Sequence, residues 1–163
     1  MKILVDADSC PKQARDLVLR RAGKLGIPVI FAANRPIPDA AGAQMEICPA
    51  SDNAADDRIV ELSESGDIAL TRDVPLAKRL VEKNINVLDD RGRIFTKNNI
   101  NELLSLRNFT VGLAENGMEI VRTANYGKKE LKTFADSLDR IITKIINHES
   151  YLWYAHEPTR KKK

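Results

Sequence analysis

The sequence has few cysteines and histidines and contains no long apolar run. Its two cysteines, Cys10 and Cys48, fit no zinc-binding spacing, and a disulfide between them is not expected in a reducing compartment. The two histidines, His148 and His156, lie near no motif, which argues against a catalytic histidine. These shortages argue against a disulfide scaffold, a cysteine-based zinc site and histidine catalysis, and they leave the carboxylates as the main candidates for chemistry.

Hydrophobic patterning also limits where the chain can act. No apolar run approaches the roughly 20 residues that span a bilayer. The first apolar stretch, residues 2–5, is too short for a signal peptide and leads directly into Asp6. We therefore expect a cytoplasmic protein with no membrane association. The net charge of +3 does not by itself indicate binding to nucleic acid.

Strand and helix patterns alternate over the first two thirds of the chain. The expected strands cover residues 2–5, 27–33, 44–48, 68–71 and 86–88, with a further strand at 94–96. The expected helices between them cover residues 11–24, 52–63 and 75–83. This alternation predicts an α/β fold, in which helices cover both faces of a mainly parallel sheet.

The last third of the chain is predicted to be helical. Two helices are expected at 98–107 and 108–116, and a longer one at 128–147. The longer helix has an apolar stripe at i, i+3, i+4 and i+7 spacing and should pack on the sheet. We expect one domain over residues 1–147 and a flexible C-terminal extension, with a basic end, over 148–163.

Three acidic motifs are placed where the predicted fold can bring them together. Asp6 and Asp8 follow the first strand, and residues i and i+2 of an extended chain point to the same side. Asp73 follows a later buried strand, and the C-terminal ends of parallel strands share one edge of a sheet. Asp56 and Asp57 lie on the helix between them, beside its buried face. The sequence therefore predicts an acidic cluster at one edge of the sheet.

Such crowding favours a divalent cation. Neighbouring carboxylates repel one another unless a cation offsets their charge. Oxygen ligands without a matching histidine or cysteine set favour Mg²⁺ or Mn²⁺ over zinc. A cation held in this way suits phosphodiester hydrolysis, because it polarises a phosphoryl oxygen and lowers the pKa of a bound water. The alternative is that these residues are helix caps and solvated charges: Asp8 could cap the helix at Pro11, and Asp73 the helix at Pro75.

The same motifs carry a resemblance to a known family. Over residues 2–147 the chain resembles the YaiI/YqxD family, a bacterial family assigned to the PIN-like nuclease superfamily. The segments that carry the resemblance are VDADSCP at 5–11, AAN at 32–34, ADDRIV at 55–60, GD at 66–67, LTRDVPLA at 70–77 and DRG at 90–92.

This resemblance implies a PIN-like three-layer α/β domain with a metal-dependent, ribonuclease-like site. It implies Asp6, Asp56 (or its neighbour Asp57) and Asp73 as the catalytic acids, and Asp89 or Asp90 as a fourth. The full set of expected metal ligands is Asp6, Asp8, Asp56, Asp57, Asp73 and Asp90. The expected cofactor is Mg²⁺ or Mn²⁺, and the expected partner is nucleic acid, RNA rather than DNA.

Basic residues near the predicted edge are candidates for contacts with phosphates. The residues expected to bind substrate are Arg35, Arg72, Arg91 and Asn34, and Asn34 also belongs to one of the resembling motifs. Ordinary solvated charges remain the alternative for each arginine. The basic end, residues 160–163, could add sequence-independent attraction to nucleic acid, and the aromatic residues at 151–154 could stack on bases.

Two other functions remain open. The Asp-x-Asp start is shared with haloacid-dehalogenase-like phosphatases, in which Asp6 would be the nucleophile and Asp8 the general acid. Those enzymes usually continue with a Gly-Thr-type turn and need a lysine before the final acidic pair, whereas here a helix begins at once after Pro11. The third reading is a non-catalytic module that binds RNA or a protein.

Overall fold

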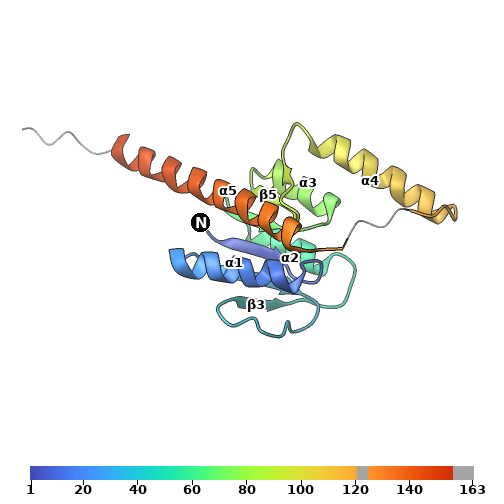
Figure 1. Ribbon diagram of the computed structural model, residues 1–163, viewed down its shortest axis with the longest axis horizontal. Coiled ribbons are helices and arrows are strands. Elements are labelled where there is room, and N and C mark those ends of the chain that lie inside the picture. Colours follow the sequence, from blue (N-terminus) through green and yellow to red (C-terminus); the bar gives the residue numbers. More distant parts are fainter. Residues whose placement is uncertain (121–124, 156–163) are drawn as a thin grey trace, which may run out of the picture.

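The fold is a three-layer α/β domain with a six-stranded sheet at its centre (Figure 1). The computed structural model describes residues 1–120 and 125–155, with side chains described as far as residue 149. The strands are β1 (Ile3–Asp6), β2 (Val29–Ala33), β3 (Gln44–Ile47), β4 (Ile68–Leu70), β5 (Asn86–Leu88) and β6 (Ile94–Phe95). Their order is β3-β2-β1-β4-β5-β6; β6 is antiparallel to β5 and the other pairs are parallel. The predicted α/β class is therefore confirmed.

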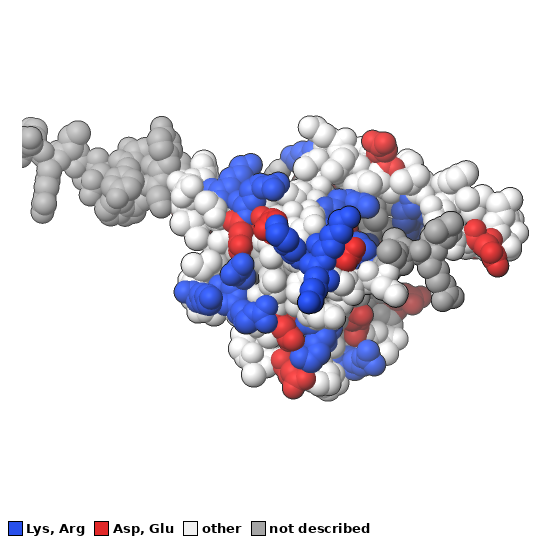
Figure 2. Space-filling view, in the orientation of Figure 1, with Lys and Arg blue, Asp and Glu red and all other residues white. Residues whose placement is uncertain are grey.

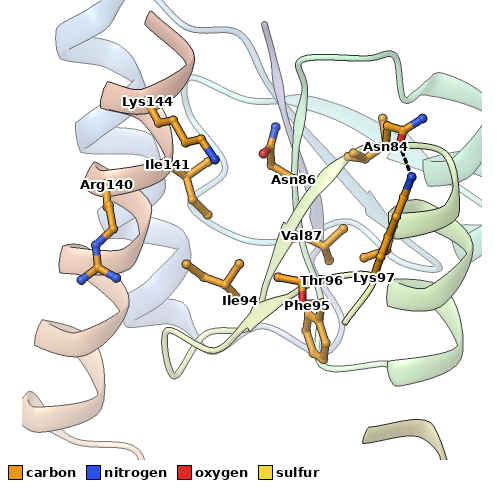
Figure 3. A pocket seen from close by; sticks show the side chains of 12 residues that line it. Asn84, Asn86, Val87, Ile94, Phe95, Thr96, Lys97, Arg140, Ile141 and Lys144 are labelled. Carbon is orange, nitrogen blue, oxygen red and sulfur yellow. Dashed lines mark hydrogen bonds between the residues drawn. The ribbon is translucent and has the colours of Figure 1, made fainter. Parts of the chain in front are cut away.

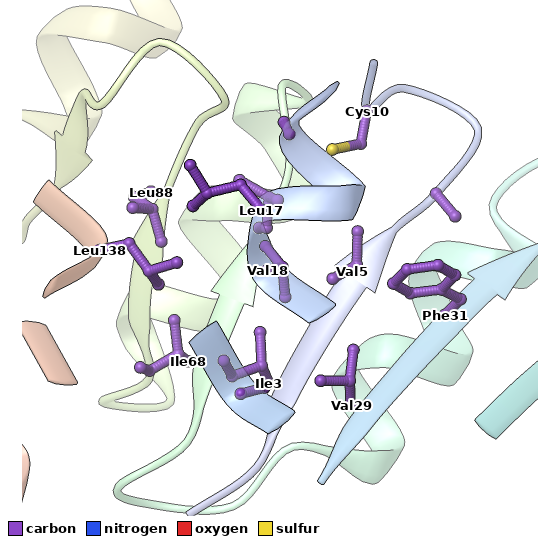
Figure 4. Packing of buried hydrophobic residues seen from close by; sticks show 14 of the residues in the cluster. Ile3, Val5, Cys10, Leu17, Val18, Val29, Phe31, Ile68, Leu88 and Leu138 are labelled. Atoms are coloured by element: carbon purple, nitrogen blue, oxygen red, sulfur yellow. The ribbon is translucent and has the colours of Figure 1, made fainter. Parts of the chain in front are cut away.

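Alternating residues of the strands build a core on each face of the sheet. Ile3 and Val5 of β1 lie in one core with apolar residues of α1 (Lys12–Leu25) and α5 (Lys128–Ala155), and Figure 4 shows this packing. Leu4 faces the other core, which contains residues of α2 (Ala54–Leu62), α3 (Val74–Glu82) and the start of α4 (Ile100–Glu115). Because both faces are covered, the parallel strands are almost continuously apolar.

The long C-terminal helix packs on the sheet as its apolar stripe predicts. Phe134, Leu138, Ile141, Ile142 and Ile145 are all buried in the core shared with α1. The helix continues to Ala155, whereas the sequence pattern predicted an end near residue 147. His156, the basic end and the side chains of the aromatic residues at 151–154 lie outside the described residues.

The two helices expected at 98–107 and 108–116 are one continuous helix, α4, so that prediction was wrong. The only buried residue of α4 is Ile100, and Leu106 and Phe109 are exposed. A helix that packs mainly at one end has no buried stripe along its length, which explains why periodicity did not reveal its continuity. Nowhere in 1–120 or 125–155 is a helix both long and apolar enough to cross a bilayer.

The turn between β5 and β6 is fastened to α5. Gly92 has a φ of +85°, and a Cβ placed on it would lie 2.6 Å from the carbonyl oxygen of Thr133. The hydroxyl of Ser137 donates a hydrogen bond to the carbonyl oxygen of Gly92 at 2.8 Å. Glycine is required here both for the backbone conformation and for the close approach of the helix.

Candidate functional site

A hollow opens at the C-terminal ends of the strands, where the chain changes direction across the sheet. From β1 the chain first reaches β2 through α1 on one face, and it later returns through α2 on the other face to β4, on the far side of β1. Loops diverge at such a switch point and leave a crevice. The hollow has a volume of about 310 Å³ and is lined by Asp6, Asp8, Ser9, Asn34, Ser51, Asn53, Ala54, Ala55, Asp56 and Asp73.

Asp6 is the most enclosed acid of the hollow. It is the last residue of β1, and only 7% of it is exposed. Its Oδ2 accepts hydrogen bonds from Ser9 Oγ at 2.8 Å and from Thr71 Oγ1 at 2.9 Å. Burial raises the pKa of the Asp6 carboxyl; the two hydrogen bonds oppose this, and the charges of Asp73 and Asp8 add to it.

Asp73 follows β4 and is joined to Asp6 through one hydroxyl group. The backbone N–H of Asp73 donates to Thr71 Oγ1 at 3.0 Å, and the same hydroxyl donates to Asp6. Oδ1 of Asp73 accepts from the backbone N–H of Leu76, so Asp73 also caps α3, as the capping alternative proposed. Capping uses one carboxylate oxygen and does not remove Asp73 from the lining of the hollow.

Asp56 brings a third carboxylate from the first turn of α2. The pKa of this carboxyl is raised to about 6, first by burial and then by the charges of Asp73 and Asp6, which Arg79 partly offsets. The carboxylates of three different elements therefore influence one another, and the repulsion predicted from the sequence is present in the folded chain.

Asp8 lies at the rim and is held by the loop that follows β2. Its Oδ2 accepts from the backbone N–H of Asn34 at 2.9 Å, and its Oδ1 lies 3.7 Å from Nε of Arg35, an exposed side chain. The idea that Asp8 caps α1 is wrong, because the N-cap position is Pro11 and no side chain caps that helix. The Asp8 side chain instead accepts a hydrogen bond from the loop after β2.

Asp57 points away from the hollow. It is adjacent to Asp56, but successive helical residues diverge by about 100°. Its side chain is exposed and forms an ion pair with Arg79 at 2.8 Å. Asp56, not Asp57, is thus the α2 residue that lines the hollow.

Asp90 and Arg72 neutralise each other beside the hollow instead of lining it. Nε of Arg72 donates to Asp90 Oδ1 at 2.6 Å, and its Nη2 donates to Oδ2. The Asp90 side chain is only 1% exposed, and its backbone carbonyl accepts a hydrogen bond from the Tyr126 hydroxyl. A two-pronged contact of this kind fixes the loop after β5 against the end of β4.

The remaining predicted residues of that loop are also engaged elsewhere. Asp89 Oδ1 accepts hydrogen bonds from the backbone N–H groups of Arg91 and Arg93. The Arg91 guanidinium lies 5.8 Å from the ring centroid of Tyr126 and 3.9 Å from a carboxylate oxygen of Glu130. Of the predicted substrate contacts, Asn34 lines the hollow and Arg35 lies at its rim beside Asp8.

The donor set of the hollow fits a hard cation in its chemistry. Asp6, Asp8, Asp56 and Asp73 offer only carboxylate oxygens, which Mg²⁺ and Mn²⁺ prefer. Their spacing does not form a closed metal site: within 1–120 and 125–155, no three Asp, Glu, His or Cys side chains are grouped so as to hold a metal ion. The hydrogen bonds to Asp6, Asp8 and Asp73 each occupy one carboxylate oxygen.

Sequence reasoning missed the neutral residues that organise the acids. Thr71 is 2% exposed and links Asp6 to Asp73, and Ser9 supports Asp6 from the loop before α1. The Leu-Thr-Arg-Asp segment contained this signal, because a hydroxyl two residues before a helix cap commonly bonds to nearby backbone. Asn53 lines the hollow with a φ of +63°, a conformation that asparagine tolerates better than most residues.

The buried thiol near the site has no nucleophilic character. Burial raises the pKa of Cys10 to about 12, and the nearby Asp90 carboxylate adds to that effect. Since the thiolate is the reactive form, the buried Cys10 serves as a packing residue of the core.

Comparisons with known proteins identify the family. The family model described as "Uncharacterized BCR, YaiI/YqxD family" matches residues 4–144. A "UPF0178 protein" of Treponema denticola is 49% identical over 146 residues, which cover 90% of this chain and 94% of the relative. A "UPF0178 protein" of Ectopseudomonas mendocina is 40% identical over 147 residues, covering 89% and 99%. No solved structure matches the chain with significance. The chain therefore belongs to the YaiI/YqxD family.

Proposed function

We propose that this protein is a metal-dependent nuclease that hydrolyses phosphodiester bonds of RNA. The observation that supports the proposal most directly is the convergence of Asp6, Asp8, Asp56 and Asp73, from separate segments of the chain, on one hollow at the switch point of the sheet. The pKa of Asp56 is raised first by burial and then by the charges of Asp73 and Asp6, so the folded chain holds this carboxylate in an environment that disfavours its charge. Sites where carboxyl pKa values are perturbed in a hollow are candidates for function.

In this proposal the four carboxylates hold one or two Mg²⁺ or Mn²⁺ ions. Asp6 is kept in place by Ser9 and Thr71, and its second oxygen is available to a cation. Asp73 offers the oxygen that does not cap α3. Asp8 and Asp56 complete the set from the rim and from α2. The bound ion supplies charge stabilisation at the phosphoryl group and a water of lowered pKa.

Side chains of the protein would position the substrate and the attacking water. Asp56 lines the hollow from α2, where a carboxylate oxygen that does not hold the ion could accept a hydrogen bond from the attacking water. Arg35 stands exposed at the rim, where a guanidinium can contact a phosphate of the strand. Asn34 lines the hollow beside it. RNA is proposed over DNA because the family resembles PIN-like proteins with a ribonuclease-like site.

The proposal is tested by incubating the purified protein with labelled single-stranded RNAs in Mn²⁺, in Mg²⁺ and in EDTA. We expect cleavage that needs the metal and that falls by at least 100-fold in Asp6→Asn, whose amide oxygen can still accept the bonds from Ser9 and Thr71. Asp136→Asn is the matched control, because Asp136 lies on α5 and pairs with Lys132 away from the hollow. Cleavage in EDTA, or equal cleavage by wild type and Asp6→Asn, would contradict the proposal.

Assays on the same purified protein distinguish the nuclease from the two alternative functions. A phosphatase of the haloacid-dehalogenase type would hydrolyse p-nitrophenyl phosphate, form an acyl phosphate on Asp6 and leave RNA intact. A non-catalytic module would bind RNA or the metal without cleaving any RNA offered. The lysine that such phosphatases need is absent from the residues that line the hollow, which favours the nuclease.

A further inference from the structure

A second hollow, of about 540 Å³, lies between the β5–β6 edge of the sheet and α5 (Figure 3). It lies toward the N-terminal end of β5, whereas the first hollow, called the acidic hollow from here on, lies at the C-terminal ends of β1 and β4. It contains Asn86, the first residue of β5, whereas the acids follow the last residues of β1 and β4. Its volume falls within the range of sites for small molecules.

The floor of this second hollow is apolar and belongs to the protein core. Ile94 and Ile141 approach each other from β6 and α5 in Figure 3, with Val87 of β5 between the two sides of the hollow. The buried residues of the lining are Val81, Ile85, Val87, Phe95 and Ile141. Such a floor excludes water from one face of a ligand and suits a flat apolar ring.

The rim carries positive charge without any acid. Lys97, Arg140 and Lys144 line the hollow, and its lining includes no Asp or Glu. Lys97 bonds to the neutral side-chain oxygen of Asn84 at 2.7 Å, so its charge is not neutralised. Arg140 and Lys144 form no ion pair with any residue in the part of the chain that the structure describes.

This arrangement differs from the rest of the surface formed by α1 and α5. Figure 2 shows basic side chains on this face interspersed with acidic ones. Lys132 pairs with Asp136 at 3.0 Å, and Arg21 pairs with Asp139 at 3.0 Å. Cations are thus balanced along the neighbouring turns of α5 and are unbalanced at the second hollow, which gives that hollow charge complementarity to an anion.

The side chains of Asn84 and Asn86 add a hydrogen-bond donor and an acceptor to the lining of the second hollow. Asn86 Nδ2 donates to the carbonyl oxygen of Asp67 at 3.2 Å, and the Asn86 Oδ1 has no partner among the described residues. Asn84 Oδ1 accepts from Lys97, and its Nδ2 is likewise without a described partner. A ring that presents both an acceptor and a donor at its edge, as a nucleobase does, matches this pair.

We propose that the second hollow binds a mononucleotide. The base lies on the apolar floor with its edge toward Asn84 and Asn86, and the phosphate lies at Arg140 and Lys144. Figure 3 shows Asn84 across the hollow from Arg140 and Lys144, with Asn86 between the two sides, so a ligand that reaches all four residues is elongated. The site would accept a free nucleotide or the terminal nucleotide of a strand, and it does not depend on the proposed nuclease activity.

The test is a calorimetric titration of the full chain in EDTA, so that no divalent ion occupies the acidic hollow. The probes are the four 5′-monophosphates, the matching nucleosides, inorganic phosphate and octanoate. We expect at least one monophosphate to bind, and to bind more tightly than its nucleoside or phosphate alone. Arg140→Gln should weaken that binding by roughly tenfold, the value of one charge-assisted hydrogen bond.

Two variants serve as controls. Lys132→Gln removes a cation from the same helix outside the hollow, and it should bind the nucleotide as the wild type does. Asp56→Asn alters the acidic hollow and should also bind normally. The proposal is overturned if no monophosphate binds at millimolar concentration, if octanoate binds as tightly as the nucleotide, or if Arg140→Gln binds unchanged. A nucleotide affinity that changes in Asp56→Asn would instead assign the binding to the acidic hollow and overturn the proposal.

Discussion

Removing the negative charge of Asp56 should make the folded protein more stable above neutral pH. The pKa of this carboxyl is about 6 in the folded chain and 3.8 in the reference state, a difference of about two units. Two units correspond to about 3 kcal/mol without screening. Asp56 is only partly buried, and solvent screening reduces the expected gain in the free energy of unfolding to about 1 kcal/mol.

The pH dependence of this gain in stability follows from the direction of the pKa shift of Asp56. Because the folded-state pKa is raised, the protonated carboxyl is the form that the fold tolerates. Its contribution to stability is complete below about pH 4 and is lost as the pH rises through about 6. Asp56→Asn should therefore match the wild type near pH 4 and exceed it near pH 8, where the melting temperature should be about 2–4 °C higher.

The assay is thermal unfolding in EDTA at pH values from 4 to 8. Asp57→Asn is the matched control, because Asp57 is the next residue, is exposed and pairs with Arg79. That variant should lose at most about 0.5 kcal/mol of unfolding free energy. If Asp56→Asn is less stable than the wild type at pH 8, or if its advantage does not change with pH, the inference that burial and neighbouring acids disfavour the charged Asp56 carboxylate is refuted.

Three further substitutions test the supports of the site and the fold, each by urea unfolding. Thr71→Val should cost about 2 kcal/mol of unfolding free energy, because this buried hydroxyl both donates and accepts a hydrogen bond. Arg72→Gln should cost about 3 kcal/mol, since it leaves the buried Asp90 carboxylate without its cation; an unchanged midpoint would show that solvent reaches Asp90. Gly92→Ala should cost about 3 kcal/mol through its positive φ and its clash with α5, whereas Gly23→Ala, with nothing within 4 Å, should be neutral or stabilising.

The sheet could be predicted because its strands are buried on both faces. The central strands are short apolar runs bounded by turn residues, and each expected strand is present within two residues of its predicted ends. The two shorter helices expected over 98–116 failed as a prediction. Most of α4 makes no contact with the core, so its sequence carries no periodic signal to mark a single helix.

The meeting of Asp6 and Asp73 could be predicted because sheet topology places the ends of parallel strands together. The side-chain pairings could not be predicted, since they depend on contacts between distant segments. Asp90, in the loop after β5, pairs with Arg72, in the loop after β4. Asp57 is the next residue after Asp56, but its side chain faces solvent and pairs with Arg79. Thr71 was overlooked for a related reason: its bond to Asp6 joins residues that are 65 positions apart in the chain.

The central claim is that the acidic hollow takes up a divalent cation, and a titration of the metal-free protein with Mn²⁺ tests it most directly. The account predicts saturable binding at pH 7.5 by the wild type and by Asp136→Asn, and binding at least tenfold weaker in Asp73→Asn. Asparagine can still cap α3, so this variant should keep its fold. Equal uptake of Mn²⁺ by the wild type and Asp73→Asn, or no uptake by either, would contradict the account.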